Sequence, residues 1–204
     1  MKTTLPSIIL ALLLFTACGN SEKKDDKTTS EEEKTEAVET SKENEINLKQ
    51  NGDYTRLYSP GDQCKLTTAQ LAEALGYEEN SIEEQSNYEG YCRYDVAHPS
   101  GVTVNYGISL EKWPKDIVSD AIKSGLESEM VDIQISESGD TYIKRHPAQG
   151  FLLLLNPNYA NPVKISFNYM NTGTPLTDSQ KEERKQNTYK IANYLINTSK
   201  NQPL

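Results

Sequence analysis

The chain has 204 residues, of which 35% are hydrophobic and 25% are charged, and its formal net charge is −9 at pH 7. This charge disfavours a nucleic-acid partner, because binding to phosphates requires a basic protein surface. It also disfavours electrostatic attachment to anionic lipids, so attachment to a membrane would require covalently bound acyl chains.

The first eighteen residues have the pattern of an export signal. Lys2 precedes an apolar run over residues 8–15, and small residues follow this run up to Cys18. A basic start, a short apolar segment and a small-residue cleavage point are typical of such signals. The apolar run is too short for a transmembrane helix of the mature protein, which needs about 20 apolar residues. We therefore predict that residues 1–17 are a signal peptide.

The end of this signal, Phe15-Thr16-Ala17-Cys18, resembles the lipobox of bacterial lipoproteins. The resemblance implies a diacylglyceryl thioether on Cys18, cleavage before this residue, and acylation of the new amino group. Phe15 stands where the lipobox usually has leucine. Gly19, and not Asp, follows the cysteine, which implies the outer membrane if the source is a diderm bacterium. An ordinary signal peptide with a chance cysteine is the competing interpretation.

Residues 18–50 are predicted to form a lipid-anchored, disordered tether. The segment contains no aromatic residue and few large apolar ones, so it buries too little surface to offset the entropy lost on ordering. At about 5–6 Å × √n, roughly 30 residues span about 30 Å, which would hold the domain off the lipid surface. The acidic residues leave a second interpretation open, a surface-export signal of the kind that some lipoproteins carry.

Residues 51–204 are predicted to form one α+β domain, an antiparallel sheet of about five strands with three flanking helices in the order α-β-β-α-β-β-β-α. Helices are expected over residues 67–76, 114–129 and 177–199. Strands are expected over residues 87–94, 102–110, 131–135, 151–155 and 163–169.

Local signals support several of these elements. Thr67 with Gln70, and Thr177 with Gln180, have the spacing of a capping box at a helix start. Gly76 is placed to end the first helix. The continuous apolar run over residues 151–155 predicts a central strand that is buried on both faces. Trp113, next to a proline, is expected to anchor the second helix on the sheet.

Two cysteines remain if Cys18 carries lipid. Cys64 and Cys92 are an even pair in an exported chain, where disulfides form and persist, so we expect them to be bonded to each other. A two-cysteine metal site is the alternative, but only His98 and His146 could supply imidazole ligands to it.

Residues 64–94 carry a second resemblance. Cys64-Lys65-Leu66-Thr67 and Cys92-Arg93-Tyr94 resemble a group of secreted bacterial lipoproteins of unknown function, in which a Cys-x-Leu-Thr segment is disulfide-linked to a Cys-x-Tyr or Cys-x-Trp strand. The resemblance implies the disulfide and an α/β domain, and it implies no activity.

Motifs for catalysis are absent from the sequence. Neither histidine has a metal-binding spacing, and there is no Gly-x-Ser-x-Gly elbow or phosphate loop. His98 and His146 each precede a proline and are expected in exposed loops. Carboxylate pairs such as Glu83-Glu84 are expected on a solvated face. We therefore predict no catalytic residue, no metal and no cofactor.

The aromatic residues are the strongest indication of a binding surface. The chain contains twelve tyrosines but only three phenylalanines and one tryptophan. Tyrosine is enriched in recognition surfaces. Tyr88, Tyr91 and Tyr94 surround Cys92. On one continuous strand, Tyr88 and Tyr94 would share a face and Tyr91 would point to the other. Packing in the core and at its rim is the alternative role for these tyrosines.

Taken together, these features favour a lipid-anchored module of the bacterial cell envelope. Its partners would be the membrane, through the lipid on Cys18, and an envelope protein or a small-molecule ligand, as in accessory, inhibitor or immunity proteins. The alternative is an envelope hydrolase, which would require two carboxylates facing each other across a cleft.

The predicted disulfide would stabilise the domain. Closing the loop between Cys64 and Cys92 removes denatured-state entropy worth roughly 3–4 kcal/mol. Reduction, or the substitution Cys92→Ala, should lower the melting temperature by several degrees without changing the strand content. A thiol count on the unfolded, unreduced protein checks the pairing, and two free thiols would contradict it.

Overall fold

A seven-stranded antiparallel sheet is the framework of the part of the chain that the computed structural model describes, residues 48, 57–58, 66–146, 148–169 and 173–200. These residues all belong to the unit Thr40–Leu204. The predicted signal peptide, Cys18, Cys64 and, apart from Leu48, the predicted tether lie outside the described residues.

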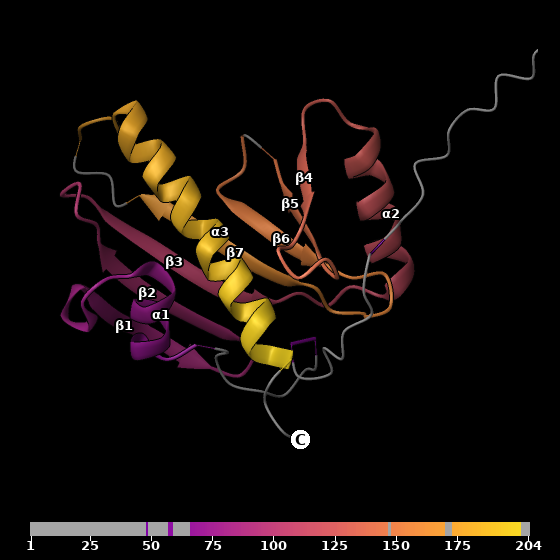
Figure 1. Cartoon of the computed structure of the whole chain (residues 1–204), viewed down its shortest axis with the longest axis horizontal. Helices are drawn as coiled ribbons and strands as arrows, with labels where there is room; N and C mark the ends of the chain where they lie inside the picture. Colours follow the sequence, from indigo (N-terminus) through magenta and orange to yellow (C-terminus); the bar gives the residue numbers. More distant parts are fainter. Residues whose placement is uncertain (1–47, 49–56, 59–65, 147, 170–172, 201–204) are drawn as a thin grey trace, which may run out of the picture. The chain divides into compact units, whose positions relative to one another are not determined.

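The strands form two meanders that meet in the middle of the sheet. Their order across the sheet is β1-β2-β3-β7-β6-β5-β4, so β3 and β7 join the two halves, and β1 and β4 are the edges (Figure 1). The strands are β1 Ile82–Tyr88, β2 Tyr91–Ala97, β3 Thr103–Leu110, β4 Asp132–Ile135, β5 Tyr142–Arg145, β6 Phe151–Leu155 and β7 Val163–Tyr169.

The α+β class, the antiparallel sheet and the three helices are confirmed, but the strand count of about five and the element order were wrong. The sequence pattern missed β5, which has only four residues, and β1, which has one buried residue, Ile82. The strand expected over residues 87–94 is instead the end of β1, a two-residue turn and the first half of β2. Gly90 has φ +70° and reverses the chain between β1 and β2, a conformation that glycine adopts without steric cost.

The three helices are α1 Thr68–Leu75, α2 Lys115–Glu127 and α3 Asp178–Lys200, and a short 3₁₀ turn follows α1. The expected anchoring role of Trp113 is consistent with the structure, since its side chain packs against the small core beneath α2. No described helix is both long enough and apolar enough to cross a membrane.

Both predicted capping boxes are present. At the start of α1, the backbone N–H of Gln70 donates to Thr67 Oγ1 over 3.2 Å, and the N–H of Thr67 donates to Gln70 Oε1 over 2.9 Å. The same reciprocal pair joins Thr177 and Gln180 before α3. Gly76, with φ +73°, ends α1 as expected.

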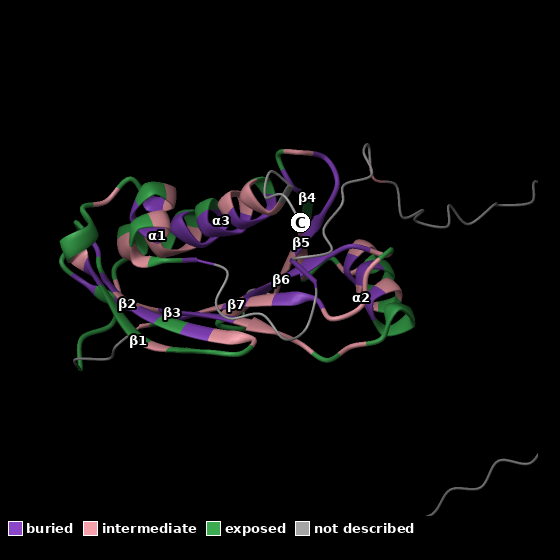
Figure 2. Ribbon diagram, turned by 90° about the horizontal axis from the view of Figure 1, so that it is seen from below, coloured by how far each residue is buried: buried purple, intermediate pink, exposed green. Residues whose placement is uncertain are grey.

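The helices lie on opposite faces of the sheet. Figure 2 shows α1 and α3 together on one side of β1, β2 and β3. The alternating side chains of β6 separate the two layers, because Leu154 packs in the large core with Ile191 of α3, whereas Leu155 packs with Val118 and Ile122 of α2. The prediction that residues 151–155 form a strand buried on both faces is therefore confirmed.

The segment before α1 is tied to β2 by a buried hydrogen bond. Tyr94 Oη donates to the carbonyl oxygen of Leu66 over 2.5 Å, and both residues are buried. Cys92 is also fully buried and lies two residues before Tyr94, in phase with it on the strand. The bond therefore fixes Leu66, the residue directly before the N-cap of α1, against this face of β2.

Removing this hydroxyl should destabilise the domain. Tyr94→Phe leaves the buried carbonyl of Leu66 without this donor, which costs about 1–3 kcal/mol. Denaturant unfolding measures the loss. Tyr169→Phe is the matched control, because its hydroxyl donates to the carbonyl of Thr174 at an exposed site. A loss no larger than that of the control would contradict a stabilising role for the Tyr94 bond.

Candidate functional site

A polar crevice between the edge strand β4 and helix α3 is the candidate site. It has a volume of about 520 Å³. Its lining comes from two segments that are some fifty residues apart in the sequence, and most of the side chains are polar. The lining residues are Asp132, Gln134, Ile135, Glu137, Lys185, Gln186, Tyr189 and Asn193.

The register of β4 explains why polar side chains face α3. Asp132 lies opposite Arg145 of β5, and Gln134 lies opposite Ile143. Ile143 belongs to the core beneath α3, and directly paired residues in a sheet share a face. Asp132 and Gln134 therefore stand on the α3 side, at an edge where β4 has no described neighbour beyond β5.

Two hydrogen bonds cross the crevice to α3, one from β4 and one from the segment that follows β4. Tyr189 Oη donates to Asp132 Oδ2 over 2.7 Å, and the backbone N–H of Glu137 donates to Asn193 Oδ1 over 3.2 Å. Burial, with a further contribution from the Asp132 carboxylate, raises the pKa of Tyr189, so its hydroxyl stays protonated as the donor. The crevice is therefore preformed by contacts within the protein.

The crevice offers chemistry for polar recognition. Gln134, Glu137 and Lys185 form no side-chain hydrogen bond or ion pair within the described part of the chain. Ile135, which is 36% exposed, adds an apolar contact. Carboxylate, amide and ammonium groups with free hydrogen-bonding capacity can orient a bound ligand. The sequence contains no motif that links these residues, because their spacing follows from the packing of α3.

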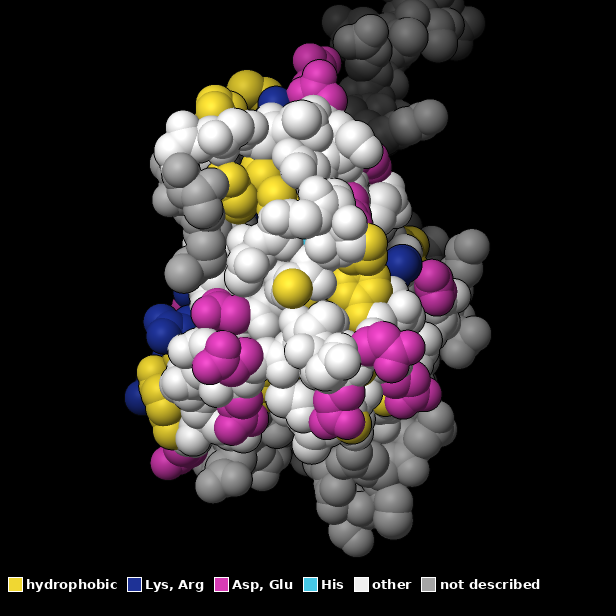
Figure 3. All heavy atoms as spheres, turned by 90° about the vertical axis from the view of Figure 1, so that its left-hand side faces the viewer, with side chains coloured by type: hydrophobic (Ala, Val, Ile, Leu, Met, Phe, Trp, Pro, Cys, Tyr) yellow, Lys and Arg dark blue, Asp and Glu magenta, His cyan; other side chains and the backbone are white. Residues whose placement is uncertain are grey.

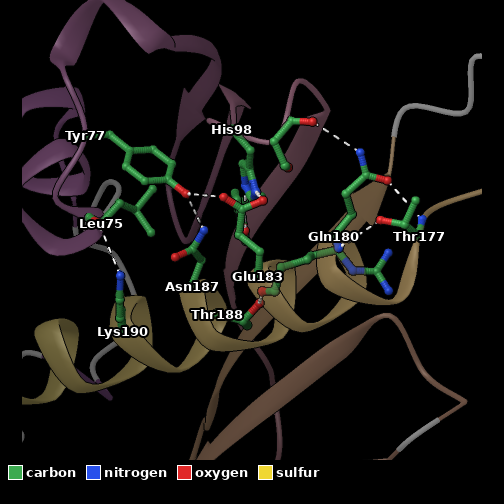
Figure 4. Close-up of polar contacts among 12 residues, drawn as sticks. Leu75, Tyr77, His98, Thr177, Gln180, Glu183, Asn187, Thr188 and Lys190 are labelled. Carbon is green, nitrogen blue, oxygen red and sulfur yellow. Dashed lines mark hydrogen bonds and ion pairs between the residues drawn. The ribbon is translucent and has the colours of Figure 1, made fainter.

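A second polar cluster lies beneath α3, on the side towards α1 (Figure 4). His98 is 4% exposed, and its Nε2 lies 3.1 Å from Tyr106 Oη, while its Nδ1 lies 3.5 Å from Glu183 Oε2. Tyr77 Oη donates to Glu183 Oε1 over 3.3 Å and accepts from Asn187 Nδ2 over 2.7 Å. The cluster thus connects α3 to the end of β2, to β3 and to the segment after α1.

The burial of His98 corrects the prediction of an exposed loop histidine. The backbone N–H of His98 donates to the carbonyl of Val102 over 2.8 Å, which closes the β2–β3 hairpin directly after the strand. His98 therefore continues the alternation of Tyr94 and Val96, which are both buried. The alternation of apolar and polar residues along this strand continues past residue 94 and is the sequence signal for a buried side chain at position 98. His146 is partly exposed in the loop after β5.

The environment of His98 favours its neutral form. Burial lowers the pKa of His98, and the nearby carboxylate of Glu183 offsets only part of this effect. Burial also raises the pKa of Tyr106 and of Tyr77, so both phenols stay protonated. The cluster consequently joins α3 to the sheet through neutral hydrogen-bonding groups and a single carboxylate.

The three tyrosines proposed as a binding surface do not lie together. Tyr88 of β1 pairs with Tyr91 of β2 across the hairpin, and their ring centroids are 5.0 Å apart. Tyr88 is 58% exposed, whereas Tyr94 is fully buried in the core. Tyr88 thus shares a face with Tyr91 and not with Tyr94. Glu83 and Glu84 are exposed on the same edge strand, and Figure 3 shows acidic side chains across this side of the domain.

Among residues 66–146, 148–169 and 173–199, no group of three or more His, Cys, Asp or Glu side chains is placed to hold a metal ion. No family model, no curated protein and no solved structure matches the chain.

The stability of the domain should depend on the ionisation of His98. In the unfolded chain its imidazole has a pKa of about 6.5, and burial lowers this value in the folded protein. Stability is therefore highest above pH 6.5 and falls as the pH drops below it, by at most about 1.4 kcal/mol per pH unit. Unfolding free energies measured between pH 5 and pH 8 test this.

Two variants isolate the contribution of His98 from that of the carboxylates. His98→Gln should flatten the pH dependence between pH 5 and pH 7, since the variant has no imidazole to protonate on unfolding. His146→Gln is the control and should retain the slope of the wild type. Equal slopes for His98→Gln and His146→Gln would show that His98 is not kept neutral by burial.

Proposed function

We propose that this protein is a lipid-anchored binding module of the bacterial cell envelope, and that its binding surface is the crevice between β4 and α3. The partner would be an envelope protein or a small-molecule ligand. Such a module would act as an accessory, inhibitor or immunity protein at the membrane to which Cys18 attaches it.

The crevice is the observation that carries the binding role. Hydrogen bonds within the protein fix its two walls relative to each other. They join Tyr189 to Asp132 and Glu137 to Asn193. Three of its other polar side chains, Gln134, Glu137 and Lys185, form no hydrogen bond or ion pair with a side chain in the described residues. Preformed polar groups at a concave surface bind a ligand without the cost of ordering the site.

The envelope location is supported by the lipobox-like sequence ending at Cys18 and by the composition of residues 18–50. The acidic character of the chain supports an anchor of acyl chains, because a net charge of −9 does not favour anionic headgroups. In a diderm source, the glycine after Cys18 favours the outer membrane.

Replacing the acylated residue should abolish membrane attachment. In Cys18→Ser no thioether can form, so the protein should leave the membrane fraction or stay unprocessed. Cell fractionation with immunoblotting measures its distribution, and mass spectrometry of the mature wild-type protein identifies the modification. An unmodified cysteine at position 18 in the mature protein would contradict the anchor.

Cross-linking from within the crevice should trap the ligand. A photoreactive amino acid at Gln134 of β4 lies in the crevice, whereas the same group at Gln85 of β1 is on the opposite edge strand, and both positions are exposed. After irradiation of intact cells, we expect a discrete adduct in intact-mass spectra and on gels from position 134 only. Equal adducts from both positions, or none from 134, would contradict the crevice as the binding surface.

A further inference from the structure

Two arginines, Arg145 and Arg184, lie between the sheet and α3, next to residues that line the crevice but not in its lining. Arg145 ends β5 and lies directly opposite Asp132 of β4. Arg184 is on α3, one residue before the crevice residue Lys185, and its guanidinium carbon lies 5.3 Å from the ring centroid of Phe167 on β7. Both arginines are partly buried.

Within the described residues, no carboxylate is paired with either arginine. The Nε atom of each is buried and has no hydrogen-bond partner. Asp132, the nearest carboxylate by register, accepts the hydroxyl of Tyr189, and Glu183 is directed towards His98 and Tyr77.

The two guanidinium groups also act on each other. Burial lowers the pKa of Arg184, and the charge of Arg145 lowers it further. Buried charges are normally paired, because removing them from water is costly. Lys185 adds a third positive charge at the crevice, whose lining contains two carboxylates, Asp132 and Glu137.

We propose that Arg145 and Arg184 form a binding site for an oxyanion, the phosphate or carboxylate group of the ligand that occupies the crevice. The inference rests on the proposed function only in taking the crevice as the place of binding. Guanidinium groups bind such anions through charge-assisted hydrogen bonds, so an anion would pair with both positive charges and offset their repulsion. Because the whole protein repels anions, affinity must come from this local site.

Calorimetric titration of the mature protein, purified from whichever cell fraction contains it, tests the site. Sodium phosphate and sodium acetate are titrated separately at pH 7, with sodium chloride keeping the ionic strength constant. We expect saturable binding of at least one anion. The anion that binds more tightly shows whether the site prefers a phosphate or a carboxylate group. Arg145→Gln and Arg184→Gln should each weaken binding at least tenfold.

Arg93→Gln is the matched control. It removes the same charge from an exposed position of β2, on the face opposite α3, and should bind like the wild type. The guanidinium of Arg184 packs on Phe167, so Arg184→Gln could fail to fold. In that case Arg184→Lys is used instead. Lysine keeps the positive charge but lacks the paired N–H donors of guanidinium, so this variant should also weaken binding. Circular dichroism checks the fold of each variant.

Equal affinity of Arg145→Gln and Arg93→Gln, or no binding of either anion, would overturn the oxyanion site. This result, combined with a specific adduct from position 134, would leave the crevice as a binding surface for an uncharged ligand. Anion binding that depends on both arginines, without any adduct from position 134, would retain the oxyanion site and overturn the wider binding surface.

Discussion

The packing of α3 on the sheet is the interaction on which the rest of the described structure depends. Its apolar stripe is buried in the large core against strands from both meanders. Burying an isoleucine or leucine contributes about 1.5–3 kcal/mol, and Ile191, Leu195 and Ile196 are all fully buried. The helix therefore holds together two halves of a sheet that share only the β3–β7 pairing.

Polar contacts then decide where α3 lies along the sheet. Apolar contacts are non-directional, whereas the bonds of Glu183, Tyr189 and Asn193 have defined partners in separate parts of the domain. Glu183 faces the buried His98 cluster, and Tyr189 and Asn193 face β4 and the residue shortly after it. These bonds set the position of α3 beside the edge strand, where the crevice lies between them.

Charge is distributed unevenly over the domain. The chain is acidic, and several acidic side chains lie on the side of the domain that Figure 3 shows. Arg145 and Arg184, which have no ion-pair partner in the described part of the chain, place positive charge beneath α3. Acidic side chains and the bulge in β1 also protect that edge from pairing with other strands. Edge β4 carries the polar crevice, so the two edges of one sheet serve different purposes.

What the sequence by itself determined was local: the α+β class, the three helices with the capping boxes at Thr67 and Thr177, and the double burial of residues 151–155. These features depend on contacts within a few residues or on an apolar pattern in one segment. Only the tertiary structure decided the burial of His98, the pairing of Tyr88 with Tyr91, and the meeting of β4 with α3. Each of these joins groups whose proximity depends on how a hairpin turns or where a helix packs, and such distances leave no periodic pattern in the sequence.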